Sequence, residues 1–88
     1  MITSAQMRAA RALLGIDQRQ LAEMSGVSLP TIQRMEASDG TVRGVIDTLM
    51  KVVDAFGRAG IELIGDNAQS IEGGRGVRFK YPKPPDMP

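Results

Sequence analysis

The sequence predicts a mainly α-helical fold, with four helices followed by a β-hairpin or a pair of strands. Helix-start signals recur three times early in the chain, at Thr3, Asp17 and Ser28, each flanked by apolar residues spaced for a hydrophobic staple. Residues 45–59 then place apolar side chains at helical spacing, and residues 61–81 contain two alternating segments typical of strands. A chain of 88 residues is long enough for one domain with a core of modest size.

The composition is that of an ordinary globular protein, with 42% hydrophobic and 24% charged residues. Aromatic residues make up only 3%, so we expect an aliphatic core in which Met and Ala fill the gaps. The chain has no Cys and no His, which excludes disulfides and argues against a zinc site or a His-based proton relay. The carboxylates are scattered, so we expect neither an enzyme nor a bound cofactor.

No apolar run approaches the ~20 residues of a membrane span, and no signal peptide is visible at the start of the chain. We therefore expect a cytoplasmic protein without membrane contact.

The first helix is predicted within residues 1–15, and two short helices joined by a tight turn within residues 17–37. Gly26 lies in the turn, where a positive φ can end a helix without a Cβ clash. In the first two helices a glutamine three positions after the capping residue completes a capping box, which pairs Thr3 with Gln6 and Asp17 with Gln20.

Several residues of this stretch match one known pattern in register: Gln18, Leu21, Ala22, Gly26, Val27, Ser28 and Ile32, with Arg11 upstream and Glu36 at the end. On these residues the chain resembles the helix-turn-helix of the Cro/C1 repressor-like family, also called XRE-like, over roughly residues 3–57. The resemblance implies a four-helix domain in which the helix at residues 28–36 enters the major groove of DNA. It also implies that Arg11 pairs with Glu36 and fixes the first helix against the third. An exposed arginine that contributes nothing measurable is the alternative.

The outward face of this recognition helix predicts the contacts with DNA bases. Arg34 suits O6 and N7 of guanine, and Gln33 suits adenine. Leu29 and Pro30 can touch only a thymine methyl, and they depart from the polar residues common in the family. For Arg34, a solvated side chain or an ion pair with Glu23 is the alternative.

We expect five residues to hold the DNA backbone: Gln18, Ser28, Thr31, Thr41 and Arg43. Gln18 combines its amide with the N-terminus of the second helix, which suits a phosphate. Thr41 and Arg43 belong to the loop at residues 38–44, which lies along the DNA backbone in the family. A flexible loop that makes no contact is the alternative.

The apolar surface of residues 45–59 exceeds what a four-helix core should need. The extra flank either meets a partner subunit or packs under the C-terminal segment, whose strands pair within one chain or across a dimer. Residues 75–83 are basic without acidic residues, and they are interpreted as a solvated strand face or as a second DNA contact. The predicted dimer interface comprises Ile46, Met50, Ile61, Leu63, Val77 and Phe79.

We divide the chain into a DNA-binding domain at residues 1–59, a strand extension for dimerisation at residues 60–81, and a disordered Pro-rich tail at residues 82–88. The expected function is that of a transcriptional repressor that binds an inverted-repeat operator as a homodimer. No ligand domain is visible after the motif, so we expect no small-molecule effector. The net charge of +1 predicts weak non-specific DNA binding. The alternative is an antitoxin that binds a toxin protein and autoregulates its operon.

Overall fold

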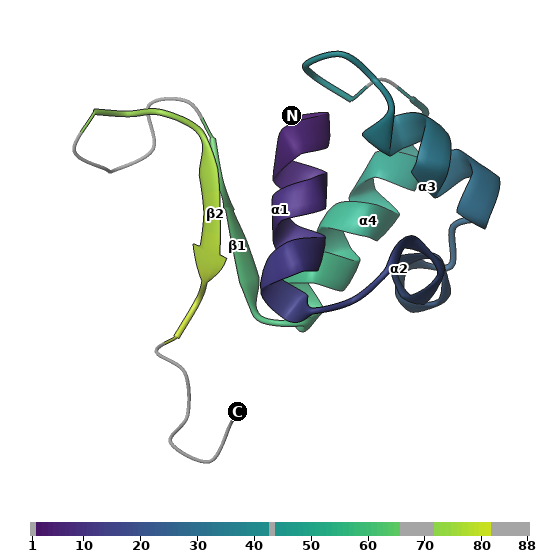
Figure 1. The fold of residues 1–88 in the computed structure, drawn as a ribbon, viewed down its shortest axis with the longest axis horizontal. Helices are drawn as coiled ribbons and strands as arrows, with labels where there is room; N and C mark the ends of the chain where they lie inside the picture. Colours follow the sequence, from purple (N-terminus) through teal and green to yellow (C-terminus); the bar gives the residue numbers. More distant parts are fainter. Residues whose placement is uncertain (1, 43, 66–71, 82–88) are drawn as a thin grey trace.

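The computed structural model describes residues 2–42, 44–65 and 72–81, and within these ranges it has four helices and a two-stranded sheet. The predicted mainly α-helical fold with a C-terminal strand pair is confirmed. The hairpin stands beside α1, on the side opposite to α2 and α3 (Figure 1). The predicted tail at residues 82–88 lies outside the described residues. The elements are α1 (Ser4–Leu14), α2 (Gln18–Ser25), α3 (Leu29–Glu36), α4 (Ile46–Arg58), β1 (Ile61–Ile64) and β2 (Gly76–Phe79).

Each of the first three helices is capped by the residue that the sequence predicts. Thr3 and Asp17 accept the backbone N–H three residues on, at 3.1 and 2.7 Å, and each donates its own N–H to the glutamine there at 2.9 Å. Ser28 accepts the N–H of Thr31 at 3.4 Å, and Pro30 occupies the first turn of α3. These bonds satisfy donors that a helix N-terminus otherwise leaves open.

The core lies between the helices and the sheet and is aliphatic apart from one phenylalanine. Its members come from all four helices and from β1, so the hairpin and the helices share one core. The largest fully buried side chains are Phe56, Met7, Leu21, Ile32, Ile61 and Val52.

α4 begins one residue later and ends one residue earlier than the helical pattern seen in the sequence at residues 45–59. Val45 precedes the helix, makes no side-chain capping bond and is 69% exposed, so it does not belong to the inner face. Ala59 is the C-cap, and Gly60 supplies the left-handed residue that follows, with φ of 89°. Lys80 completes this end, because its Nζ donates to the Gly57 carbonyl at 3.0 Å and its N–H to the Gly60 carbonyl at 2.8 Å. A cation here interacts favourably with the helix dipole.

β1 and β2 pair antiparallel within one chain, and β2 packs against α1 while β1 packs against α4. On the side of the sheet away from the helices, Arg78 forms an ion pair with Glu62 at 2.8 Å, and this bond lowers the pKa of Glu62. Part of the basic strand face is therefore neutralised within the hairpin. The register pairs Ile61 with Phe79, Glu62 with Arg78, Leu63 with Val77, and Ile64 with Gly76.

This packing corrects part of the predicted dimer interface. Ile61 is only 2% exposed and lies in the core of its own chain, so it is not available to a partner. Leu63 and Val77 are partly buried against the same core. Alternation predicts which side chains share a face of a hairpin, but it does not predict that α1 and α4 cover that face. The members that remain well exposed are Ile46, Met50 and Phe79, at 66%, 56% and 40%.

Replacing Ile61 with alanine should lower the free energy of unfolding by about 2–4 kcal/mol, because it leaves a cavity in the shared core. Urea denaturation measures the change. Leu13→Ala is the control, since Leu13 on α1 is 41% exposed and outside the core, and a change below about 1 kcal/mol is expected there. Equal effects of the two substitutions would show that the hairpin is not part of the cooperative core.

Candidate nucleic-acid interface

α2 and α3 are two short helices joined by a tight turn at Gly26. This glycine adopts φ of 71°, a left-handed conformation that side chains with a Cβ resist. Leu21 on α2 and Ile32 on α3 are fully buried, so both helices are fixed to the core. α3 therefore has one side held inward and the other side turned to solvent.

The outward side of α3 carries the four residues predicted to contact DNA bases. Pro30, Gln33 and Arg34 are exposed, and Leu29 is partly buried. Leu29 and Gln33 are four positions apart, as are Pro30 and Arg34, and this spacing makes the members of each pair neighbours on the helix surface. A rigidly packed helix with an exposed polar face is what insertion into a major groove requires.

The side chains at the start of α3 are linked to one another. The Ser28 hydroxyl donates to Thr31 Oγ1 at 2.9 Å, and Arg34 Nη2 lies 3.5 Å from the same oxygen. The second contact is long and exposed, so it holds Arg34 only weakly. The described residues include no ion pair between Arg34 and Glu23, the alternative that the sequence left open.

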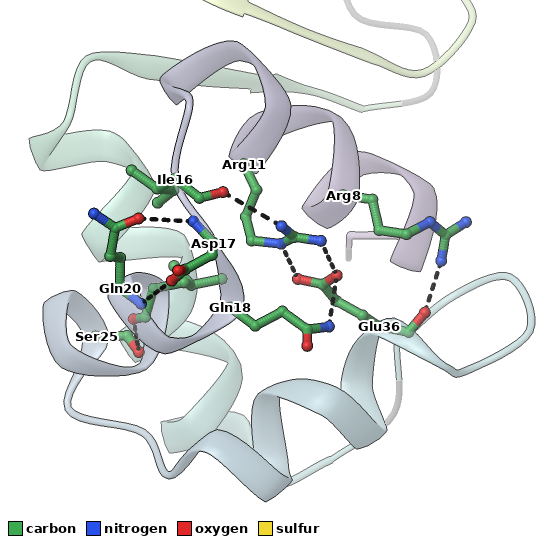
Figure 2. Close-up of polar contacts among 9 residues, drawn as sticks. Arg8, Arg11, Ile16, Asp17, Gln18, Gln20, Ser25 and Glu36 are labelled. Carbon is green, nitrogen blue, oxygen red and sulfur yellow. Dashed lines mark hydrogen bonds and ion pairs between the residues drawn. The ribbon is translucent and has the colours of Figure 1, made fainter.

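An ion pair joins α1 to the last residue of α3 (Figure 2). Arg11 donates from Nε to Oε2 of Glu36 at 2.6 Å and from Nη2 to Oε1 at 2.7 Å. The Glu36 side chain is 3% exposed and the Arg11 side chain 21%. The hydrogen bond with Glu36 raises the pKa of Arg11, against the opposing effect of burial. The pair implied by the family resemblance is therefore present, as a bidentate contact.

Gln18 adds a third donor to the same carboxylate. Its Nε2 donates to Oε1 of Glu36 at 3.2 Å, so the first residue of α2 is bonded to the last residue of α3 (Figure 2). The amide nitrogen of Gln18, which the sequence assigned to a phosphate, is thus bonded inside the protein. The Asp17 carboxylate also caps this helix end, which weakens its attraction for an anion. The backbone contact predicted for Gln18 stays a prediction.

Arg8 has a role that the sequence did not reveal. Its Nη1 donates to the backbone carbonyl of Glu36 at 2.6 Å (Figure 2). The guanidinium thereby caps the C-terminus of α3, where the helix dipole favours a cation. The signal available in the sequence was its position one turn before Arg11, on the same face of the first helix.

The loop after α3 is attached to the start of the chain. Thr3 and Thr41 form an isolated antiparallel bridge, and the Thr41 side chain is exposed. Arg43, the second backbone contact predicted in this loop, lies outside the described residues. Two backbone bonds of 2.9 Å flank the bridge, from the Ser4 N–H to Gly40 and from the Val42 N–H to Ile2.

Across residues 2–42, 44–65 and 72–81, no group of acidic side chains is arranged to hold a metal ion. No helix within those residues is long and apolar enough to cross a membrane.

Comparison with known families agrees with this geometry. A helix-turn-helix family model of the Cro/C1 type matches residues 7–63, which include both helices of the motif and more than half of the chain. A search for similar characterised proteins gave no match. The family consists of DNA-binding transcription regulators. The chain therefore belongs to the Cro/C1-type helix-turn-helix family.

Proposed function

We propose that the protein is a transcriptional repressor that binds an inverted-repeat operator as a homodimer. The observation that carries this proposal is the outward face of α3, where Gln33 and Arg34 are exposed on a helix whose other side is buried. Two such helices, one from each subunit, enter successive major grooves and block access to a promoter.

The base contacts in this proposal follow from side-chain chemistry. Arg34 donates to O6 and N7 of a guanine, and Gln33 pairs with an adenine. Leu29 and Pro30 contact a thymine methyl, the one base group in the major groove that apolar side chains recognise. Ser28, Thr31, Thr41 and Arg43, with the N-terminus of α2 at Gln18, hold the phosphates and set the register.

The homodimer is proposed to form through the apolar start of α4, the surface made by Val45, Ile46 and Met50. These side chains are 69%, 66% and 56% exposed, and neighbouring exposed apolar residues of this size are typical of an interaction surface. Asp47 and Lys51 flank the surface with opposite charges. An antiparallel, two-fold contact between two α4 helices sets Ile46 against Met50 of the second copy and brings unlike charges together.

The antitoxin alternative is favoured by a second exposed apolar surface. Phe79 and Tyr81 are 40% and 76% exposed at the open end of the hairpin, away from the connection between β1 and β2. Phe79 pairs with Ile61, which sits beside the C-terminus of α4, so this surface lies at the opposite end of α4 from Ile46. One end of the molecule would then serve a second copy and the other a toxin protein.

Selection from a random DNA pool at near-physiological salt tests the proposed function. We expect enrichment of an inverted repeat with half-sites about one helical turn apart, ~34 Å. Enrichment of a single half-site would contradict the homodimer but keep DNA recognition. No enrichment with folded protein would contradict the repressor, and co-purification would then be used to search for a toxin.

Arg34→Ala should weaken binding to the selected operator by about 1–3 kcal/mol and relax the preference at one base pair, because a bidentate contact is lost. Binding to operator variants by fluorescence anisotropy measures both effects. Arg58→Ala is the control, an exposed arginine paired with Asp54 near the end of α4. An equal loss on every sequence would make Arg34 a phosphate contact.

Ile46→Asp should weaken dimerisation at least about tenfold, since it places a charge in an apolar contact, and operator affinity should fall with it. Sedimentation equilibrium measures the dimer, and far-ultraviolet circular dichroism should show the same helix content as the wild type, because Ile46 is exposed within its own chain. Tyr81→Asp is the matched control at the other apolar surface. A dimer lost in Tyr81→Asp and kept in Ile46→Asp would move the interface to the hairpin.

A further inference from the structure

The Gln6 side chain joins three separate parts of the chain. It is 5% exposed, although glutamine is usually a surface residue. Its Oε1 accepts the Thr3 N–H at 2.9 Å, and its Nε2 donates to the carbonyls of Ile64 and Gly76 at 2.9 and 3.0 Å. Both N–H groups of the amide therefore have a carbonyl acceptor, one on each strand of the hairpin.

The two carbonyls belong to one register pair of the hairpin. Ile64 and Gly76 face each other at the end of the sheet where the chain leaves β1 and returns to β2. A donor bonded to both carbonyls holds this end against α1. The other end is held to α4 through Lys80, whose Nζ donates to the Gly57 carbonyl at 3.0 Å. The hairpin is thus fixed to the helices at both ends.

The oxygen of the same amide leads to the loop that follows the recognition helix. It bonds the N–H of Thr3, the residue whose backbone forms the bridge with Thr41. Two backbone bonds flank this bridge, one from the Ser4 N–H to the Gly40 carbonyl and one from the Val42 N–H to the Ile2 carbonyl. A continuous path of hydrogen bonds therefore runs from the two strands, through Gln6 and Thr3, to the backbone at Thr41.

We propose that Gln6 is a positioning residue for DNA binding, through which the hairpin sets the position of the loop that contacts the DNA backbone. The inference rests on the proposed function, because it takes Thr41 as a phosphate contact. The hairpin then acts on operator binding without touching DNA.

A comparison within the chain separates this role from helix capping. Gln20 occupies the same position in the capping box of α2 and accepts the Asp17 N–H at 2.9 Å. Gln20 is exposed, whereas Gln6 is buried and uses its nitrogen to bond another element. Capping needs only the side-chain oxygen, so a capping role does not account for the two bonds to the hairpin.

The first test replaces each glutamine with glutamate. Glutamate keeps the oxygen that caps a helix but cannot donate to the two strand carbonyls. In Gln6→Glu, the amides of Ser4 and Val42 should exchange roughly 3- to 30-fold faster, after correction for global stability, because the loop loses its support. In Gln20→Glu their exchange should be unchanged. Unchanged exchange in Gln6→Glu would overturn the proposal.

The second test is a double-mutant cycle on operator affinity. Gln6→Glu and Thr41→Ala should each weaken binding roughly 3- to 10-fold, and the double variant should bind no more weakly than the weaker single variant. A cycle with Arg34→Ala should be multiplicative, since Arg34 does not act through the loop. Multiplicative losses in the Thr41 cycle would mean that Gln6 affects only stability, and would contradict the inference.

If Gln6→Glu does not fold, Gln6→Met and Gln20→Met replace the glutamates in both tests. Methionine has a similar length without hydrogen-bonding nitrogen or oxygen, and the Gln20 variant reports the loss of capping alone. If the wild-type protein binds no DNA, the proposed function is contradicted. The hydrogen-exchange test still decides in that case whether Gln6 supports the loop.

Discussion

The buried carboxylate of Glu36 is the group on which the helix-turn-helix depends. A buried charge is tolerated only when it is paired and hydrogen-bonded, and here two donors from Arg11 and one from Gln18 surround it. Removing one partner of such a pair costs about 3–5 kcal/mol, because the remaining charge stays buried without compensation. The carboxylate therefore joins α1, α2 and α3, and it fixes how far the recognition helix projects from the body of the protein.

α1 makes polar contacts with α3 on one side and with the hairpin on another. Toward α3 it presents Arg8 and Arg11, which hold the backbone and the side chain of Glu36. Toward the hairpin it presents Gln6, which holds both strands. An isolated two-stranded hairpin is marginal in water, so its order comes from this contact and from the burial of Ile61. The same short helix thus contacts both the recognition helix and a hairpin whose bonded residues lie 58 and 70 positions away in sequence.

The features that could be predicted from the sequence are those that depend on residues close together in the chain. The caps at Thr3, Asp17 and Ser28 follow from local backbone chemistry, and the outward face of α3 follows from helical periodicity. The Arg11–Glu36 contact spans 25 positions and was reached only through the family resemblance. The burial of Ile61 and the second role of Gln6 were missed, because periodicity identifies a face but not the element that covers it. A capping glutamine also gives no sign of where its nitrogen points.

The distribution of cations limits how this protein can hold DNA. The net charge is +1, and at least five described cations are already bonded inside the chain, among them Arg8, Arg11, Arg58, Arg78 and Lys80. Each phosphate neutralised contributes only about −0.9 to the salt slope of binding, so one subunit with few available cations binds weakly. Two linked subunits double the contacts, and the second half-site is then bound at a high effective concentration. Tight operator binding therefore favours the proposed homodimer, in which the exposed apolar start of α4 would matter as much as the face of α3 that is proposed to contact bases.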